Sequence, residues 1–121
     1  MRFLIICLVC VSSSACVNDT TEIPPGIMPP DSLTAFIKDL EVIEAALLIM
    51  RRDAQNTEAY KDALYKHLFE KHNTSPEKMK KTLAFYTENL ALYDRIYADV
   101  ITELNQDLLK LSEKSEKTND L

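Results

Sequence analysis

LALYDRIYADVITELNQDLLKL, residues 90–111, is the longest regular pattern in this 121-residue chain, and it decides the fold. Its apolar side chains recur every three or four residues, which is the spacing of one face of an α-helix. A helix with so long an apolar face must pack against another long helix. Residues 112–121 are polar apart from Leu121 and are expected to fray. The stripe comprises Leu90, Tyr93, Tyr97, Val100, Leu104, Leu108 and Leu111, widened by Ile96 and Ile101.

The partner helix is predicted at residues 31–54. It begins at Asp31 or Ser32, and Arg51 and Arg52 suit the negative C-terminal end of a helix. We expect its apolar face to meet the stripe of residues 90–111. This face comprises Leu33, Phe36, Ile37, Leu40, Ile43, Leu47 and Met50.

Two shorter helices are predicted between these long ones, at residues 57–72 and 75–86. Ser75-Pro76 is typical of a helix start, because a hydroxyl N-cap precedes a proline at the first helical position. The chain has one glycine and little clustering of β-branched residues. Residues 31–111 are therefore predicted to form an all-α bundle of three to four helices.

The N-terminus has the pattern of a bacterial lipoprotein signal. The cationic Met1-Arg2 precedes an apolar stretch, residues 3–11, that is too short to span a membrane. Ser13-Ser14-Ala15-Cys16 follows, with small residues before a thiol that can take a diacylglyceryl group. We predict that residues 1–15 are a signal peptide and that lipidated Cys16 begins the mature protein. The alternative is an ordinary secretory signal cleaved after Ala15, which would leave a free thiol.

Lipidation would leave the mature chain without a disulfide, because Cys7 and Cys10 depart with the signal. The chain has 14 Lys and Arg against 19 Asp and Glu, and cleavage removes Arg2, so the mature net charge is about −6. This balance argues against nucleic acid and anionic membrane surfaces as partners. Acyl chains on Cys16 would supply the membrane affinity, at roughly 0.8 kcal/mol per buried methylene. The predicted location is the cell envelope, at the outer membrane and facing the periplasm.

Residues 16–30 contain four of the five prolines and the only glycine. Because proline fixes φ and lacks an N–H group, this segment is predicted to be an extended tether between the lipid and the helices. Its first half fits a disordered leader equally well. In the alternative, Ile23, Ile27 and Met28 pack back on the helical domain.

Glu44 interrupts the apolar stripe of residues 31–54. A buried carboxylate needs partners, so we expect a Lys, an Arg or a tyrosine hydroxyl beside it. Glu44 is either a structural carboxylate that fixes helix register or a general acid or ligand group with a raised pKa. The candidate tyrosines are Tyr60, Tyr86, Tyr93 and Tyr97, and the buried polar cluster that we predict is Glu44, Tyr60, Tyr86 and Tyr97.

The opposite side of the same helix carries Val42, Ala45, Ala46 and Ile49, so residues 42–50 are apolar almost all round. Either other helices cover both sides of this helix, or the second face docks another protein. In both cases the small Ala45-Ala46 pair allows a helix to approach closely.

No motif for catalysis, metal or cofactor binding is present in the sequence. His67 and His72 would lie about 140° apart on one helix and cannot share an ion. His67 with Glu70 supplies only two ligands, too few for a structural metal site. There is no phosphate-binding loop, cysteine nucleophile or serine elbow. We expect no metal, no cofactor and no enzymatic activity.

With these elements in place, the chain resembles a small Bacteroidetes-type lipoprotein domain of unknown function, in which a proline-led first helix precedes a tyrosine-rich helical hairpin. The resemblance covers roughly residues 23–108 and implies the fold and the envelope location, but no activity. A His is common in the family where Glu41 stands here. The matching residues are Ile23-Pro24-Pro25, Asp39-Leu40, Glu44-Ala45, Tyr60, Tyr65, Phe69, Ser75-Pro76-Glu77, Phe85-Tyr86, Ile96-Tyr97 and Val100.

Two functions are compatible with the sequence. The first is a lipid-anchored, non-enzymatic binding or adaptor module that engages another envelope protein or polymer. The second is a carrier or chaperone for an apolar ligand held between the helices. A pocket lined by Tyr60, Tyr86 and Tyr97 would favour the carrier, and a solid core would remove it.

Overall fold

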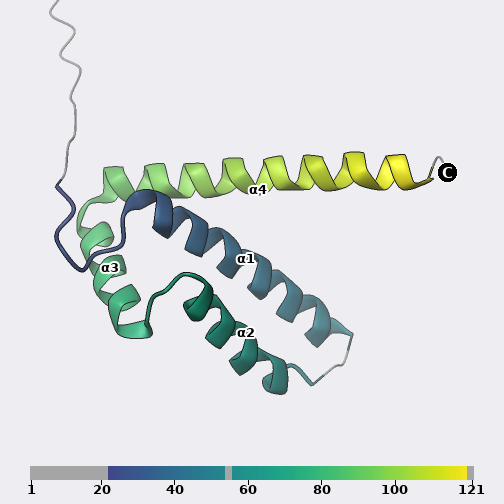
Figure 1. The fold of residues 1–121 in the computed structure, drawn as a ribbon, viewed down its shortest axis with the longest axis horizontal. Coiled ribbons are helices and arrows are strands. Elements are labelled where there is room, and N and C mark those ends of the chain that lie inside the picture. The colour runs from purple at the N-terminus through teal and green to yellow at the C-terminus, as the bar shows by residue number, and fades with distance from the viewer. Residues whose placement is uncertain (1–21, 54–55, 120–121) are drawn as a thin grey trace, which may run out of the picture.

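The computed structural model describes residues 22–53 and 56–119 of the protein. This part of the chain contains helices and no strands (Figure 1). The prediction of an all-α protein with three to four helices is therefore confirmed. The predicted signal peptide, the lipidation site and the first residues of the tether lie outside the described residues. The four helices are α1 (Pro30–Arg52), α2 (Glu58–Lys71), α3 (Pro76–Glu88) and α4 (Leu90–Asn119).

The start of α3 follows the predicted capping pattern. The Ser75 hydroxyl accepts a hydrogen bond from the backbone N–H of Lys78 at 3.2 Å, and Pro76 occupies the first turn. The helix ends two residues later than predicted, and only Asn89 separates it from α4. The Asn89 side-chain amide donates to the Phe85 carbonyl at 2.7 Å, which satisfies one of the last carbonyls of α3.

The prediction that the chain frays after Leu111 is wrong, because α4 continues to Asn119. Glutamate and lysine are good helix formers, and they dominate this polar end. The hydroxyls of Ser112 and Ser115 each donate at 2.8 Å to a carbonyl three residues earlier, so they do not break the helix. At 30 residues against 23, α4 is about 10 Å longer than α1.

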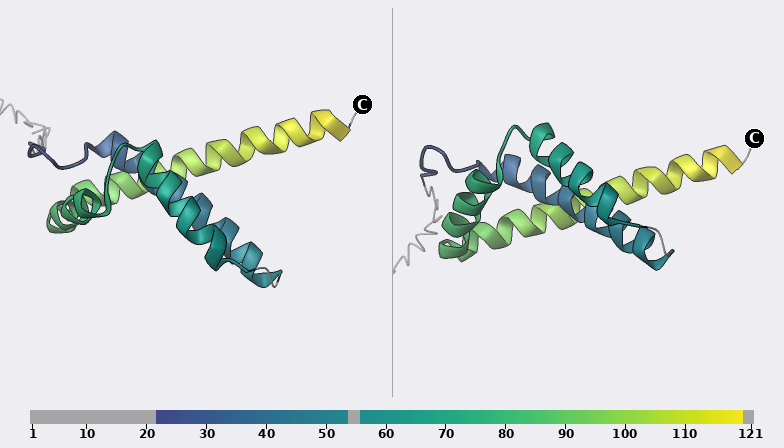
Figure 2. Two further views of the ribbon diagram at one scale, coloured as in Figure 1. Left: turned by 60° about the horizontal axis from the view of Figure 1, so that its bottom comes forward. Right: turned by 90° about the horizontal axis from the view of Figure 1, so that it is seen from below.

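Helix α1 is the centre of the fold. It packs on α4 along one side, as predicted, and on α2 along another, while α3 packs on the N-terminal part of α4. Figure 2 shows the C-terminal part of α4 projecting beyond the other three helices. Leu104 packs against the core and Asp107 pairs with Lys38 of α1, so we call the residues after them, 108–119, the free arm of α4. The main core cluster comprises Met28, Leu33, Phe36, Ile37, Leu68, Met79, Tyr86, Ile96 and Val100.

The segment before α1 belongs to the fold, so the prediction of a tether is wrong for its described part. Met28 is buried, with 3 % of its surface exposed, and Ile23 and Ile27 pack against the same core. The Met28 N–H donates to the Thr82 hydroxyl at 3.1 Å, and the Tyr86 hydroxyl donates to the Met28 carbonyl at 2.8 Å. The packing of the apolar residues against α3 outweighs the tendency of the prolines to keep the segment extended in solvent.

Candidate interaction site

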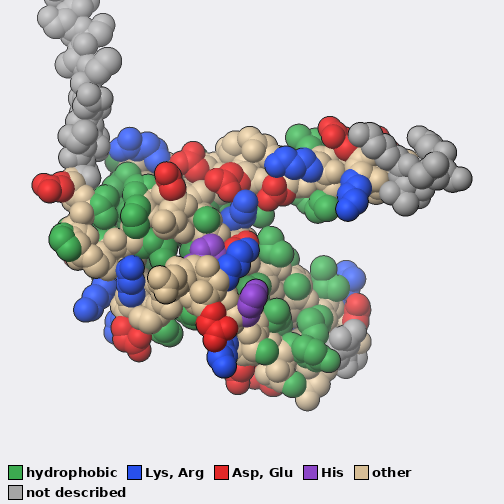
Figure 3. All heavy atoms as spheres, in the orientation of Figure 1, with side chains coloured by type: hydrophobic (Ala, Val, Ile, Leu, Met, Phe, Trp, Pro, Cys, Tyr) green, Lys and Arg blue, Asp and Glu red, His purple; other side chains and the backbone are tan. Residues whose placement is uncertain are grey.

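An apolar groove opens between α1 and α4 where the two helices diverge. Figure 3 shows this hollow between the free arm of α4 and the body formed by α1 and α2. The groove has a volume of about 580 Å³, and apart from Glu41 every side chain that lines it is apolar. Its walls are Glu41, Val42, Ala45, Ala46 and Ile49 from α1 and Leu104, Leu108 and Leu111 from α4.

The large side chains of the groove are exposed to an unusual degree. Val42 and Ile49 keep 55 % and 51 % of their surface accessible, and Leu108 and Leu111 each keep 63 %. Ala45 and Ala46 are also exposed. The other helices therefore do not cover the second face of α1. Of the two alternatives for this face, the one in which other helices bury it is ruled out. Monomeric proteins rarely expose contiguous apolar patches of more than a few hundred Å².

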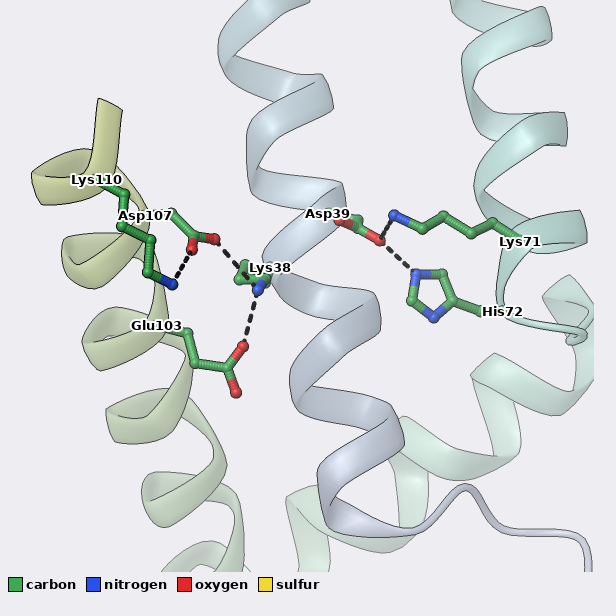
Figure 4. A network of polar contacts seen from close by, with 7 residues as sticks. All are labelled: Lys38, Asp39, Lys71, His72, Glu103, Asp107 and Lys110. Atoms are coloured by element: carbon green, nitrogen blue, oxygen red, sulfur yellow. Dashed lines mark hydrogen bonds and ion pairs between the residues drawn. The ribbon is translucent and has the colours of Figure 1, made fainter. Parts of the chain in front are cut away.

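An ion-pair cluster joins α1 to α4 next to the groove. The Lys38 ammonium lies 2.9 Å from a carboxylate oxygen of Glu103 and 3.3 Å from one of Asp107 (Figure 4). Hydrogen bonds to Glu103 and then to Asp107 raise the pKa of Lys38 above its usual value, and the hydrogen bond from Lys38 lowers the pKa of Asp107. The cluster therefore holds the two walls together one turn before Glu41.

A second cluster joins α1 to α2. One carboxylate oxygen of Asp39 lies 2.7 Å from both the Lys71 ammonium and His72 Nε2 (Figure 4). Burial acts to raise the pKa of Asp39, but the hydrogen bonds from Lys71 and His72 oppose it and leave the pKa below its usual value. The edge of the His72 ring also meets Phe36, with 5.3 Å between the ring centroids. These contacts fix the α1 wall of the groove to the rest of the protein.

The predicted polar cluster around Glu44 does not form. Glu44 is exposed, and its carboxylate accepts a hydrogen bond from the Tyr65 hydroxyl of α2, a tyrosine that was not among the candidates. Leu47, one turn further along α1, is 2 % exposed, so the apolar stripe stays covered beyond Glu44. Glu44 lies at the edge of the covered face, where its carboxylate meets Tyr65 of α2 and remains in contact with solvent.

The predicted tyrosine partners lie in different places. Tyr86 is fully buried and uses its hydroxyl on Met28, whereas Tyr60 and Tyr97 are 54 % and 38 % exposed. Tyr97 pairs with Tyr93 in an edge contact, with ring centroids 4.9 Å apart, and a hydrogen bond between their hydroxyls at 3.4 Å, followed by burial, raises the pKa of Tyr93 to about 12. The structure therefore does not bring Tyr60, Tyr86 and Tyr97 together around a pocket.

The histidines are also apart. His67 is exposed on α2, and His72 is engaged with Asp39. Over residues 22–53 and 56–119, no three His, Cys, Asp or Glu side chains are arranged to hold a metal ion. In the same ranges no helix is both long enough and apolar enough to cross a membrane.

Sequence reasoning missed the α4 wall of the groove. Leu104, Leu108 and Leu111 were expected to pack against α1, but only Leu104 is partly buried there. The apolar stripe of α4 extends further along its helix than the part of the stripe that α1 covers. Leu108 and Leu111 at the end of the stripe are therefore left without a neighbouring helix. Exposed Leu108 and Leu111, one turn apart on the same face, indicate a part of the helix that lacks a partner.

The four helices and the open groove define a small all-α protein whose candidate site is a surface between helices. The chain belongs to a family described as a domain of unknown function, DUF4296, whose model matches residues 24–109. The match begins in the docked N-terminal segment and includes both ion-pair clusters and the groove as far as Leu108. No curated protein and no solved structure matches the chain.

Proposed function

We propose that this chain is a lipid-anchored protein of the cell envelope that binds another protein and catalyses no reaction. The observation that carries the proposal is the groove between α1 and α4. Its exposed Val42, Ile49, Leu108 and Leu111 form one continuous apolar surface between two rigidly joined helices. Exposed apolar patches of this kind mark sites of association with other molecules.

The position of the groove supports an anchored arrangement. The described part of the chain begins beside α3 and the N-terminal end of α4 (Figure 1). The groove lies further toward the C-terminal end of α4, where Leu104, Leu108 and Leu111 line it. A lipid on Cys16 would lie six residues before Glu22. The groove would then face away from the anchored end, toward the periplasm, where a protein partner can reach it.

The carrier function has less support. It relied on a pocket lined by Tyr60, Tyr86 and Tyr97, and these side chains are dispersed over the core and the surface. The groove that does exist is open along one side (Figure 3). An extended apolar ligand would remain partly in water there, whereas the face of a helix would cover both walls.

The binding surface is tested by photocrosslinking the full-length, membrane-bound protein. A photoreactive phenylalanine analogue replaces Leu108 in one variant and Leu109 in the other. These neighbours are 63 % and 64 % exposed, but only Leu108 lines the groove. We expect a discrete protein adduct at position 108 and none at position 109. Equal adducts at both positions, or none at position 108, would contradict a protein-binding groove.

The anchor is tested separately. We expect the mature N-terminal peptide to begin at Cys16 and to carry the mass of a diacylglyceryl group and further acyl chains. A Cys16→Ala variant should leave the membrane fraction. An unmodified N-terminus with membrane retention unchanged in the variant would refute the anchor without affecting the crosslinking result.

A further inference from the structure

We propose that the occupant of the groove is the free arm of α4 from a second copy of this chain. The inference rests on the proposed function, since it names the partner for the same surface. It follows from a property of α4 that the groove alone does not explain: the apolar face whose Leu104, Leu108 and Leu111 line the groove continues outside it to Ile101 and Tyr97.

This apolar face of α4 has the spacing of a helix-pairing seam. Its members are separated by four, three, four and three residues, which is the repeat of helices that wind around each other. Ile101, Leu108 and Leu111 are 58 %, 63 % and 63 % exposed, and Tyr97 is 38 % exposed. Helix α1 therefore leaves this seam largely uncovered. The seam is Tyr97, Ile101, Leu104, Leu108 and Leu111.

The groove and the free arm complement each other. The α1 wall contributes the small side chains Ala45 and Ala46 between the larger Val42 and Ile49, so a helix can approach it closely. A helix that fills the groove needs apolar side chains on successive turns, and the free arm presents them. With twofold symmetry, each copy donates its arm to the other's groove and receives one in return, so association stops at two chains. Helices α1 and α4 of both copies would then form a four-helix arrangement at the interface.

The available area matches a weak dimer. Covering the exposed side chains of the groove and seam removes on the order of 500 Å² per copy. The total of about 1,000 Å² reaches the minimum for a biological interface and lies below the range of about 1,200–2,000 Å² that is typical of stable complexes. The acidic charge of each copy opposes association at long range. Added salt screens that repulsion, so the dimer should strengthen as ionic strength rises.

The first test measures the mass of the full-length protein, purified from membranes in a mild detergent, by light scattering corrected for bound detergent. We expect two chains per particle for the wild type. Leu108→Arg should weaken the dimer by about 100-fold or more, because each interface loses two leucines and gains two buried charges. Leu109→Arg is the matched control and should remain a dimer. Both side chains are exposed in the single chain, so neither substitution should destabilise the fold of the monomer.

The second test works in the membrane before any detergent is added. An Ile101→Cys, Leu111→Cys double variant is oxidised, and dimers are sought on a non-reducing gel. The two positions are ten residues apart on one helix and cannot bridge within a chain. We expect the double variant to form a crosslinked dimer, and we expect this dimer to disappear when Leu108→Arg is added to it.

The outcomes separate this inference from the proposed function. A monomeric wild type with no cysteine crosslink, together with a Leu108 photoadduct to a different protein, would overturn the second copy and leave a protein-binding groove. A dimer that Leu108→Arg does not disturb would also overturn the inference, because the copies would then meet elsewhere. A photoadduct at twice the mass of the chain supports the inference and the proposed function together.

Discussion

Replacing Tyr86 by phenylalanine tests whether the segment before α1 is a structural part of the domain. The Tyr86 side chain is fully buried, and its hydroxyl donates to the carbonyl of Met28, which is itself 3 % exposed. The substitution keeps the ring in place and removes only this donor. The Met28 carbonyl is then buried without that partner.

The expected cost follows from that loss. Leaving a buried carbonyl without its partner costs about 1–3 kcal/mol, and we expect the middle of that range because both groups are enclosed. For a domain of this size, each kcal/mol lowers the melting temperature by roughly 4–8 °C, so Tyr86→Phe should melt about 8–16 °C below the wild type. The Met28 N–H, which donates to Thr82, should also lose protection from hydrogen exchange.

The assay combines thermal or urea unfolding with amide hydrogen exchange of the full-length protein. Tyr60→Phe is the control, because its ring is 54 % exposed and its variant should stay within about 0.5 kcal/mol of the wild type. If Tyr86→Phe and Tyr60→Phe have the same stability, and the Met28 amide exchanges equally fast in both, the segment is not docked on α3 and the reasoning fails.

Substitutions at three further positions test the contacts between and within the helices. Asp39→Asn should lower stability at neutral pH. The deficit should shrink as the pH falls below about 3.8, because the folded-state pKa of Asp39 is depressed and its contribution is lost on protonation; urea midpoints at pH 7 and pH 3 measure this. Lys38→Met should also lower stability at neutral pH. Because the folded-state pKa of Lys38 is raised, that deficit should persist up to about pH 10.5 and vanish above it, and an unchanged difference between melting temperatures at pH 7 and pH 11.5 would contradict the ion pairs with α4. Ser75→Ala removes the N-cap of α3 and should cost about 1 kcal/mol, measured by urea unfolding, whereas Ser75→Asp should retain most of the stability.

The sequence predicted the helices well because their signals are local. The spacing of apolar residues identified α1 and α4, and Ser75-Pro76 located the start of α3 within one residue. The relative placement of helices depends on contacts between distant residues. Lys38 and Glu103 are 65 residues apart, and no pattern within either helix indicates that they meet.

The same reason explains the errors at the site. Glu44 was expected to be buried because it lies within an apolar stripe, yet whether a position at the edge of the stripe is covered depends on how the neighbouring helices pack. The docking of Met28 was left as an alternative, since composition alone favours an extended segment when four prolines are present. The second face of α1 was predicted as a candidate surface, and its side chains are exposed. The opposite wall of the groove, on α4, could not be predicted without the arrangement of the helices.

The docked N-terminal segment also determines how force would enter the molecule. A pull on the chain before Glu22 meets the hydrogen bonds of Met28 with Thr82 and Tyr86 before it reaches α1. Undocking the eight residues 22–29 would lengthen the extended chain before α1 by up to about 28 Å while the four helices stay folded. Under tension the segment can thus extend before any helix unfolds, and it does so only after its hydrogen bonds to Thr82 and Tyr86 of α3 break.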